Sequence, residues 1–73
     1  MYLFKQKVEG ALYSVALHEG VNLNSPEKAV KGLVFQVFEG LSELVYEGVT
    51  FWFFKSDGLH ISLNSKYWEM TES

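Results

Sequence analysis

The chain has 73 residues, a formal net charge of −3 and no cysteine. This length fits a single domain spanning residues 1–73, and the absence of cysteine excludes disulfides and thiolate metal sites. The cationic side chains are six lysines and no arginine, which disfavours a general nucleic-acid binder because arginine reads phosphate and guanine best. With 48% hydrophobic residues the chain can pack a core. So short a chain nevertheless buries little surface, which favours association with a partner.

The first segment predicts a β-hairpin. Two strand-like runs flank Glu9-Gly10, and a two-residue turn there would set Phe4 opposite Val15. In that register Phe4 and Val15 lie on the apolar face, and Lys5 and Lys7 lie on the other face.

The middle of the chain predicts an amphipathic helix. Ser25 and Pro26 match an N-cap and a first helical residue, and Gly48 matches a helix stop. Gly32 and Gly40 are interpreted either as tolerated at exposed positions or as points where a partner backbone comes close. Apolar residues recur with the spacing of one helix face at Val30, Leu33, Val34, Val37, Phe38, Leu41, Leu44 and Val45.

Two features lie outside the apolar stripe of that predicted helix. Glu39 and Glu43 would lie one turn apart and form an acidic ridge with Glu47. Such a ridge is interpreted as a solvated face, with contact to a basic partner surface as the alternative. Phe35 would point away from the stripe.

The last part of the chain predicts a second hairpin. Four aromatic residues precede Asp57-Gly58, which is a strong two-residue turn signal. The turn sends Trp52 and Phe54 to the apolar face and Phe51 and Phe53 to the other face. The predicted opposed pairs are Ser56–Leu59, Phe54–Ile61, Trp52–Leu63, Lys55–His60, Phe53–Ser62 and Phe51–Asn64.

The C-terminal tail, residues 66–73, carries Tyr67, Trp68 and Met70. We expect it to fold back over the sheet or over the helix end, with residues 71–73 loose. Together the elements predict an α+β fold of the order β-β-α-β-β. It would be a two-layer domain in which one amphipathic helix packs on one face of a four-stranded antiparallel sheet, with the strand order left open.

One helix covers one face, so the other face of the predicted sheet would expose Phe51 and Phe53. Three interpretations are open. The tail could cover these rings, a protein partner or a second copy could dock on them, or single-stranded nucleic acid could stack its bases there and place its phosphates on lysines. The candidate partner-binding residues are Phe51, Phe53, Lys55, His60, Lys5, Lys7, Phe35, Glu39 and Glu43.

No residue pattern indicates catalysis. The serines have no evident histidine or carboxylate partner, and His18 and His60 lack the ligand spacing of a structural zinc site. His60 is the best single titratable candidate and is interpreted as a surface strand histidine, whereas His18 is expected to face solvent. We therefore expect no catalytic residue, no metal and no cofactor.

These observations predict a small non-enzymatic protein-binding module. It would act as a regulator or inhibitor by occupying a partner's surface, and a phage or another mobile element could encode it. The alternatives are a single-stranded nucleic-acid-binding protein and a structural homodimer subunit. No apolar run approaches the roughly 20 residues of a membrane span, and Lys5 and Lys7 interrupt any signal peptide. The expected location is the cytoplasm, or the host cytoplasm for a phage protein.

Overall fold

The computed structural model describes residues 1–17 and 25–73, which form strands joined by turns and loops. The strands are β1 (Tyr2–Gln6), β2 (Leu12–Leu17), β3 (Ser25–Lys28), β4 (Phe35–Val37), β5 (Ser42–Tyr46), β6 (Val49–Ser56), β7 (Leu59–Asn64) and β8 (Trp68–Glu72). They pair in two antiparallel sheets, a small sheet of order β4-β1-β8 and a large sheet of order β3-β2-β7-β6-β5. The predicted α+β fold is therefore wrong, because the described residues are all-β. None of them forms a helix that could cross a membrane.

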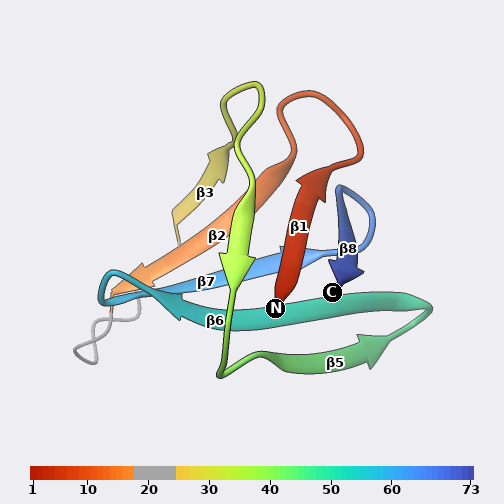
Figure 1. Cartoon of the computed structure of the whole chain (residues 1–73). Helices are drawn as coiled ribbons and strands as arrows, with labels where there is room; N and C mark the ends of the chain where they lie inside the picture. The colour runs from red at the N-terminus through yellow and green to blue at the C-terminus, as the bar shows by residue number, and fades with distance from the viewer. Residues whose placement is uncertain (18–24) are drawn as a thin grey trace.

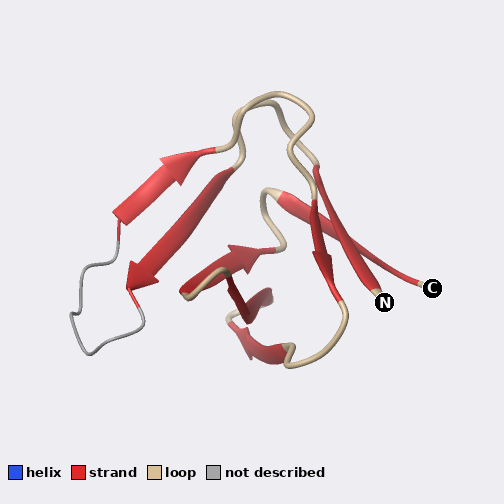
Figure 2. Ribbon diagram, turned by 60° about the vertical axis from the view of Figure 1, so that its left-hand side comes forward, coloured by secondary structure: helices blue, strands red, loops and turns tan. Residues whose placement is uncertain are grey.

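The small sheet lies against one face of the large sheet, and its strands run across β6 and β7 (Figure 1). Figure 2 shows the β2–β3 pair reaching out to the side opposite the small sheet. The core lies between the two layers. Phe4 of β1 is fully buried there, with ring centroids 5.1 Å from Trp52 and 5.9 Å from Phe54 of β6. The other buried core residues are Ala11, Ala29, Val37, Ile61, Leu63 and Trp68.

The predicted first hairpin is wrong in its pairing, although both of its strands exist. The chain turns at Glu9-Gly10, but β1 pairs with β4 and β8 while β2 pairs with β3 and β7. Backbone hydrogen bonds at either side of the turn separate the two strands. Lys7 N–H donates to the Tyr67 carbonyl (2.8 Å), and the Ala11 carbonyl accepts from Ala29 N–H (2.9 Å). The turn therefore carries the chain from one sheet to the other.

The predicted helix is replaced by three short strands, β3, β4 and β5, and the turns between them. Gly32, Gly40 and Gly48 have φ values of +84°, +76° and +79°, whereas a helix interior needs a φ near −63°. Between the first two of these glycines the side chains alternate as in a strand. Val37 is buried and Phe35 half-buried, while Gln36 between them is exposed.

The predicted second hairpin is confirmed in every opposed pair, from Phe51–Asn64 to Ser56–Leu59. Asp57 and Gly58 both have positive φ, +50° and +77°, as a type I′ turn requires. Trp52 and Phe54 point into the core, as the apolar pattern predicted. The register of this hairpin fixes which side chains of β6 remain on the outside.

The tail is a structural strand of the small sheet. Trp68 is only 1% exposed, and its Nε1–H donates to the Leu12 carbonyl (2.8 Å). Thr71 and Glu72 pair with β1, so the expectation that these two residues are loose is wrong. The terminal residues also bond to each other, since Met1 donates its ammonium to the Ser73 carbonyl (3.1 Å) and Ser73 N–H donates to the Met1 carbonyl (3.0 Å). The tail thus lies in the small sheet and leaves the outer face of the large sheet uncovered.

Candidate functional site on the open face of the large sheet

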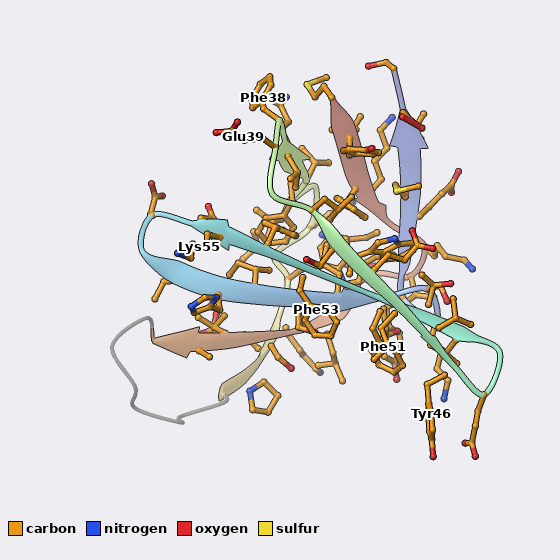
Figure 3. All side chains as sticks on the ribbon, turned by 90° about the horizontal axis from the view of Figure 1, so that it is seen from below. Phe38, Glu39, Tyr46, Phe51, Phe53 and Lys55 are labelled. Atoms are coloured by element: carbon orange, nitrogen blue, oxygen red, sulfur yellow. The ribbon has the colours of Figure 1, made fainter. Side chains whose placement is uncertain are left out.

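The outer face of the large sheet has no second layer among the described residues, and we call it the open face (Figure 3). Because side chains alternate along a strand, the burial of Trp52 and Phe54 sends Phe51 and Phe53 to this face. β5 adds Leu44, which lies opposite Phe51, and Tyr46, which lies opposite Val49. Adjacent strands thereby bring apolar side chains together on one surface.

Leu44, Tyr46, Phe51 and Phe53 form what we call the aromatic strip. Phe53 is 40% exposed, Leu44 56% and Tyr46 63%, whereas Phe51 is half-buried among its neighbours. Scattered apolar residues are ordinary on protein surfaces, but a contiguous group is characteristic of interaction sites. The aromatic strip is such a group because its members come from paired positions of β5 and β6.

Small neighbours make Phe53 stand out from this face. Across the sheet its row contains Ser42 on β5, Ser62 on β7 and Ser14 on β2, all with short side chains. Phe53 lines two hollows. The larger, of about 700 Å³, is lined by Glu39, Gly40, Ser42, Phe53, Phe54, Lys55 and His60. The smaller, of about 260 Å³, is lined by Ser14, Ala16, Phe53, His60, Ile61 and Ser62.

Charged groups of both signs border the larger hollow. Lys55 on β6 lies directly opposite His60 on β7. Glu39 comes from the bend between β4 and β5 and reaches the same hollow. Figure 3 shows Glu39 beyond the sheet on the side of Lys55. The sequence prediction thus placed Phe51, Phe53, Lys55 and His60 correctly on one face. Glu39, which was predicted on a separate acidic ridge, lines the same hollow as Lys55 and His60.

Lys5 and Lys7 do not belong to this site, so the prediction that they share a face with Phe51 and Phe53 is wrong. Lys5 pairs with Glu69 in the small sheet. The Lys7 ammonium donates to the Ser65 carbonyl (3.0 Å). Both lysines line a separate hollow of about 320 Å³ with Lys31. Both lysines lie away from the predicted face because β1 pairs in the small sheet instead of beside β2.

Phe35 and the acidic ridge were also misplaced by the helix prediction. Phe35 packs against the core, with ring centroids 5.3 Å from Trp68 and 5.6 Å from Phe54. Glu43 lies on β5 opposite Trp52, and Glu39 lies in the preceding bend, so the two carboxylates do not share a helix face. His18 lies outside the described residues.

Leu44 and Tyr46 were missed because the sequence placed them in or beside the helical stripe. The signal that would have found them is the Glu47-Gly48 pair, which has the same form as the correctly predicted Asp57-Gly58 turn. Glu47 and Gly48 have φ values of +50° and +79°, again a type I′ hairpin turn. Recognising it would have set β5 beside β6 and placed Leu44 next to Phe51.

The far edge of the large sheet has its own polar contact. Tyr13 of β2 donates its hydroxyl hydrogen to Glu27 Oε2 of β3 at 2.9 Å. Burial raises the pKa of Tyr13 above its ordinary value, and the hydrogen bond and the charge of Glu27 raise it further. This bond ties β3 to β2. Within residues 1–17 and 25–73 no group of three or more His, Asp or Glu side chains is placed to hold a metal ion.

Comparison with known proteins gave no match to a family model, to a curated protein or to a solved structure.

Proposed function

We propose that the chain is a small protein-binding module and that the open face of its large sheet is the docking surface. The observation that carries this proposal is the aromatic strip, which leaves Phe53 40% exposed although Trp52 beside it is only 6% exposed. Aromatic side chains surrounded by polar groups are the usual composition of binding hot spots.

The shape around Phe53 indicates what the partner offers. The two hollows that Phe53 lines would each receive a side chain of the partner. Glu39 and Lys55 border the larger hollow and would meet groups of opposite charge, which fixes orientation more than affinity. The module would act by occupancy, as a regulator or inhibitor that covers the partner's own working surface.

Single-stranded nucleic acid is the weaker alternative. Stacking on Phe51 and Phe53 requires nearby cations for the phosphates. Lys5 and Lys7, the lysines expected to serve in this way, lie at the small sheet, and Glu39 adds a negative charge beside Lys55. A protein partner is therefore the better fit to the charge on this face.

The test compares Phe53→Ser with Phe38→Ser. Phe38 is 74% exposed and lies outside the aromatic strip (Figure 3), so it controls for the loss of an exposed phenyl ring. Immobilised wild type and Phe38→Ser should retain the same protein from a lysate, and Phe53→Ser should lose it. With the purified partner, calorimetric titration should show a loss of about 2 kcal/mol, or roughly 30-fold in Kd, for Phe53→Ser.

Equal binding by the two variants would contradict the docking surface. Thermal unfolding of both variants checks that each stays folded. Labelled single-stranded oligonucleotides, titrated at low and moderate salt, test the alternative. Binding of these strands that Phe53→Ser abolishes and Phe38→Ser leaves unchanged would reassign the face to nucleic acid.

A further inference from the structure

β5 is an outer strand of the large sheet, and within the described residues it pairs with β6 alone. All five of its residues are exposed. Leu44, Val45 and Tyr46 are 56%, 61% and 63% exposed, so both faces of the strand carry apolar side chains open to water. An exposed apolar edge strand is a template for pairing with another strand.

The hairpin geometry identifies the backbone groups that remain open. In a two-residue hairpin the residues that flank the turn exchange backbone hydrogen bonds, and bonded pairs then alternate along the ladder. Here Tyr46 and Val49 flank the Glu47-Gly48 turn. By this alternation Leu44 turns its N–H and C=O toward β6, while Glu43 and Val45 turn theirs to the open edge.

We infer that β5 pairs antiparallel with β5 of a second copy of this chain, about a two-fold axis that passes through Leu44. Ser42 then lies opposite the partner's Tyr46, and Glu43 lies opposite the partner's Val45. Glu43 and Val45 exchange their open backbone hydrogen bonds with each other across the axis. The two large sheets become one continuous sheet, and the same patch serves on both copies, as an isologous interface requires.

Charge favours the register centred on Leu44 over the two registers in which the axis is shifted by one residue. A shift of the axis to Glu43 would set Glu43 against its own symmetry mate. A shift to Val45 would set Glu43 against the partner's Glu47. Like charges directly opposite each other destabilise a strand pair. Only the axis through Leu44 pairs each Glu43 with an apolar residue while keeping all five residues of β5 opposed.

A second copy also explains the distribution of apolar side chains on β5. Val45 points to the side of the small sheet, yet that sheet does not cover it. In the dimer Val45 lies beside the stem of the partner's Glu43, and Leu44 lies beside the partner's Leu44. The inference concerns the sheet edge and stands whether or not the open face binds a further protein.

The first experiment measures mass in solution by sedimentation equilibrium over a wide concentration range. Wild type should move from one chain to two, and Leu44→Lys should stay at one chain throughout. Val30→Lys is the matched control, since Val30 is 71% exposed, lies outside β5 and takes the same change in charge. Val30→Lys should dimerise like wild type. Because each copy carries a net charge of −3, added salt should strengthen the dimer.

The second experiment tests the register. The chain has no cysteine, so Leu44→Cys, Val45→Cys and Val30→Cys each introduce a single thiol. Across an axis at Leu44 the two Leu44 positions form a non-hydrogen-bonded pair with Cα atoms about 4.5 Å apart, which is within the range of a disulfide. Mild oxidation should therefore link Leu44→Cys into a dimer at least tenfold faster than the other two variants.

Two results would overturn the inference. One is a wild-type mass of one chain up to millimolar concentration. The other is a Val45→Cys chain that cross-links as fast as Leu44→Cys. The outcome is separable from the docking proposal, because Val45 lies on the face of β5 away from the aromatic strip. Val45→Glu would set like charges opposite each other across the axis, so this chain should be monomeric and still retain the lysate partner through Phe53.

Discussion

The two edges of the large sheet are built from opposite kinds of residue. β3, at one edge, reads Ser-Pro-Glu-Lys, and Pro26, Glu27 and Lys28 are all exposed. β5, at the other edge, reads Ser-Glu-Leu-Val-Tyr with its apolar residues exposed. Proline and charged residues are the usual means of keeping a further strand from adding to a sheet. The chain blocks one edge and leaves the other suited to pairing, so the open edge is a local property of β5 and not a general result of small size.

The largest effect is expected when the residues that block the β3 edge are replaced. The triple variant Pro26→Val, Glu27→Gln, Lys28→Val restores a backbone N–H and removes both charges, while the amide oxygen that Glu27→Gln introduces still accepts from the Tyr13 hydroxyl. One negative and one positive charge are lost, so the net charge stays at −3. A chain with two open edges has no closed assembly, and light scattering should show particles many chains in mass that grow with concentration.

Adding Leu44→Lys to this triple variant closes the β5 edge again. The combined variant should stop at two chains at most, since one open edge per chain remains. If the triple variant alone stays no larger than wild type, the residues of β3 do not block that edge and the contrast between the two edges fails.

A moderate effect is expected at the two hairpin turns. Gly48 and Gly58 have nearly equal φ values, +79° and +77°, and a Cβ at either would meet no atom within 4 Å. Gly48→Ala and Gly58→Ala should therefore each cost about 1–2 kcal/mol through backbone strain alone, measured by urea unfolding. Only Gly48 supports β5, so Gly48→Ala should also weaken the dimer. Equal dimer dissociation constants for the two variants would show that the Glu47-Gly48 turn does not influence pairing at the β5 edge.

The smallest effect is expected for the Tyr13–Glu27 hydrogen bond, which ties β3 to β2. Burial and Glu27 raise the pKa of Tyr13, so folding favours the protonated phenol. The stabilisation that the protonated Tyr13 phenol contributes is fully present below the ordinary tyrosine pKa of about 10. It falls as pH rises above that value, because Tyr13 loses its proton in the unfolded chain at a lower pH than in the folded one. Between pH 9 and about 11 the thermal midpoint of wild type should fall more steeply than that of Tyr13→Phe. Parallel curves would contradict this assignment.

The part of the fold that could be predicted was the part fixed by local signals. Asp57-Gly58 set a turn, and the alternation of Trp52 and Phe54 with Phe51 and Phe53 left one register that buries the larger apolar set. The helix prediction failed because spacings of three and four also arise when short strands follow one another with glycine turns between them. Gly32, Gly40 and Gly48, eight residues apart, marked those turns. Gly48 was interpreted as a helix stop, and Gly32 and Gly40 as tolerated in the helix or as points where a partner backbone comes close.

The candidate site was predictable only as far as that hairpin reaches. Phe53, Lys55 and His60 follow from the β6–β7 register alone. The positions of Glu39 and Leu44 depend on where β5 pairs, and the position of Lys5 depends on which sheet contains β1. Both pairings are non-local and are not fixed by local sequence signals. Glu9-Gly10 gave a correct turn, but a turn does not specify whether the chain folds back or crosses to a second sheet. In the structure the chain crosses to the second sheet, and Phe4 is buried between the two layers.

The pairing of β1 with β8 has a consequence for the order in which the molecule is assembled. Phe4 lies opposite Met70, so β1 acquires one of its two neighbours only after the other described strands have been translated. The β6–β7 ribbon has short-range contacts, whereas long-range pairing such as that of β1 with β8 is slow. Although β4 can pair with β1 earlier, the other edge of β1 stays open until β8 has been translated, and an open strand edge can pair with another chain.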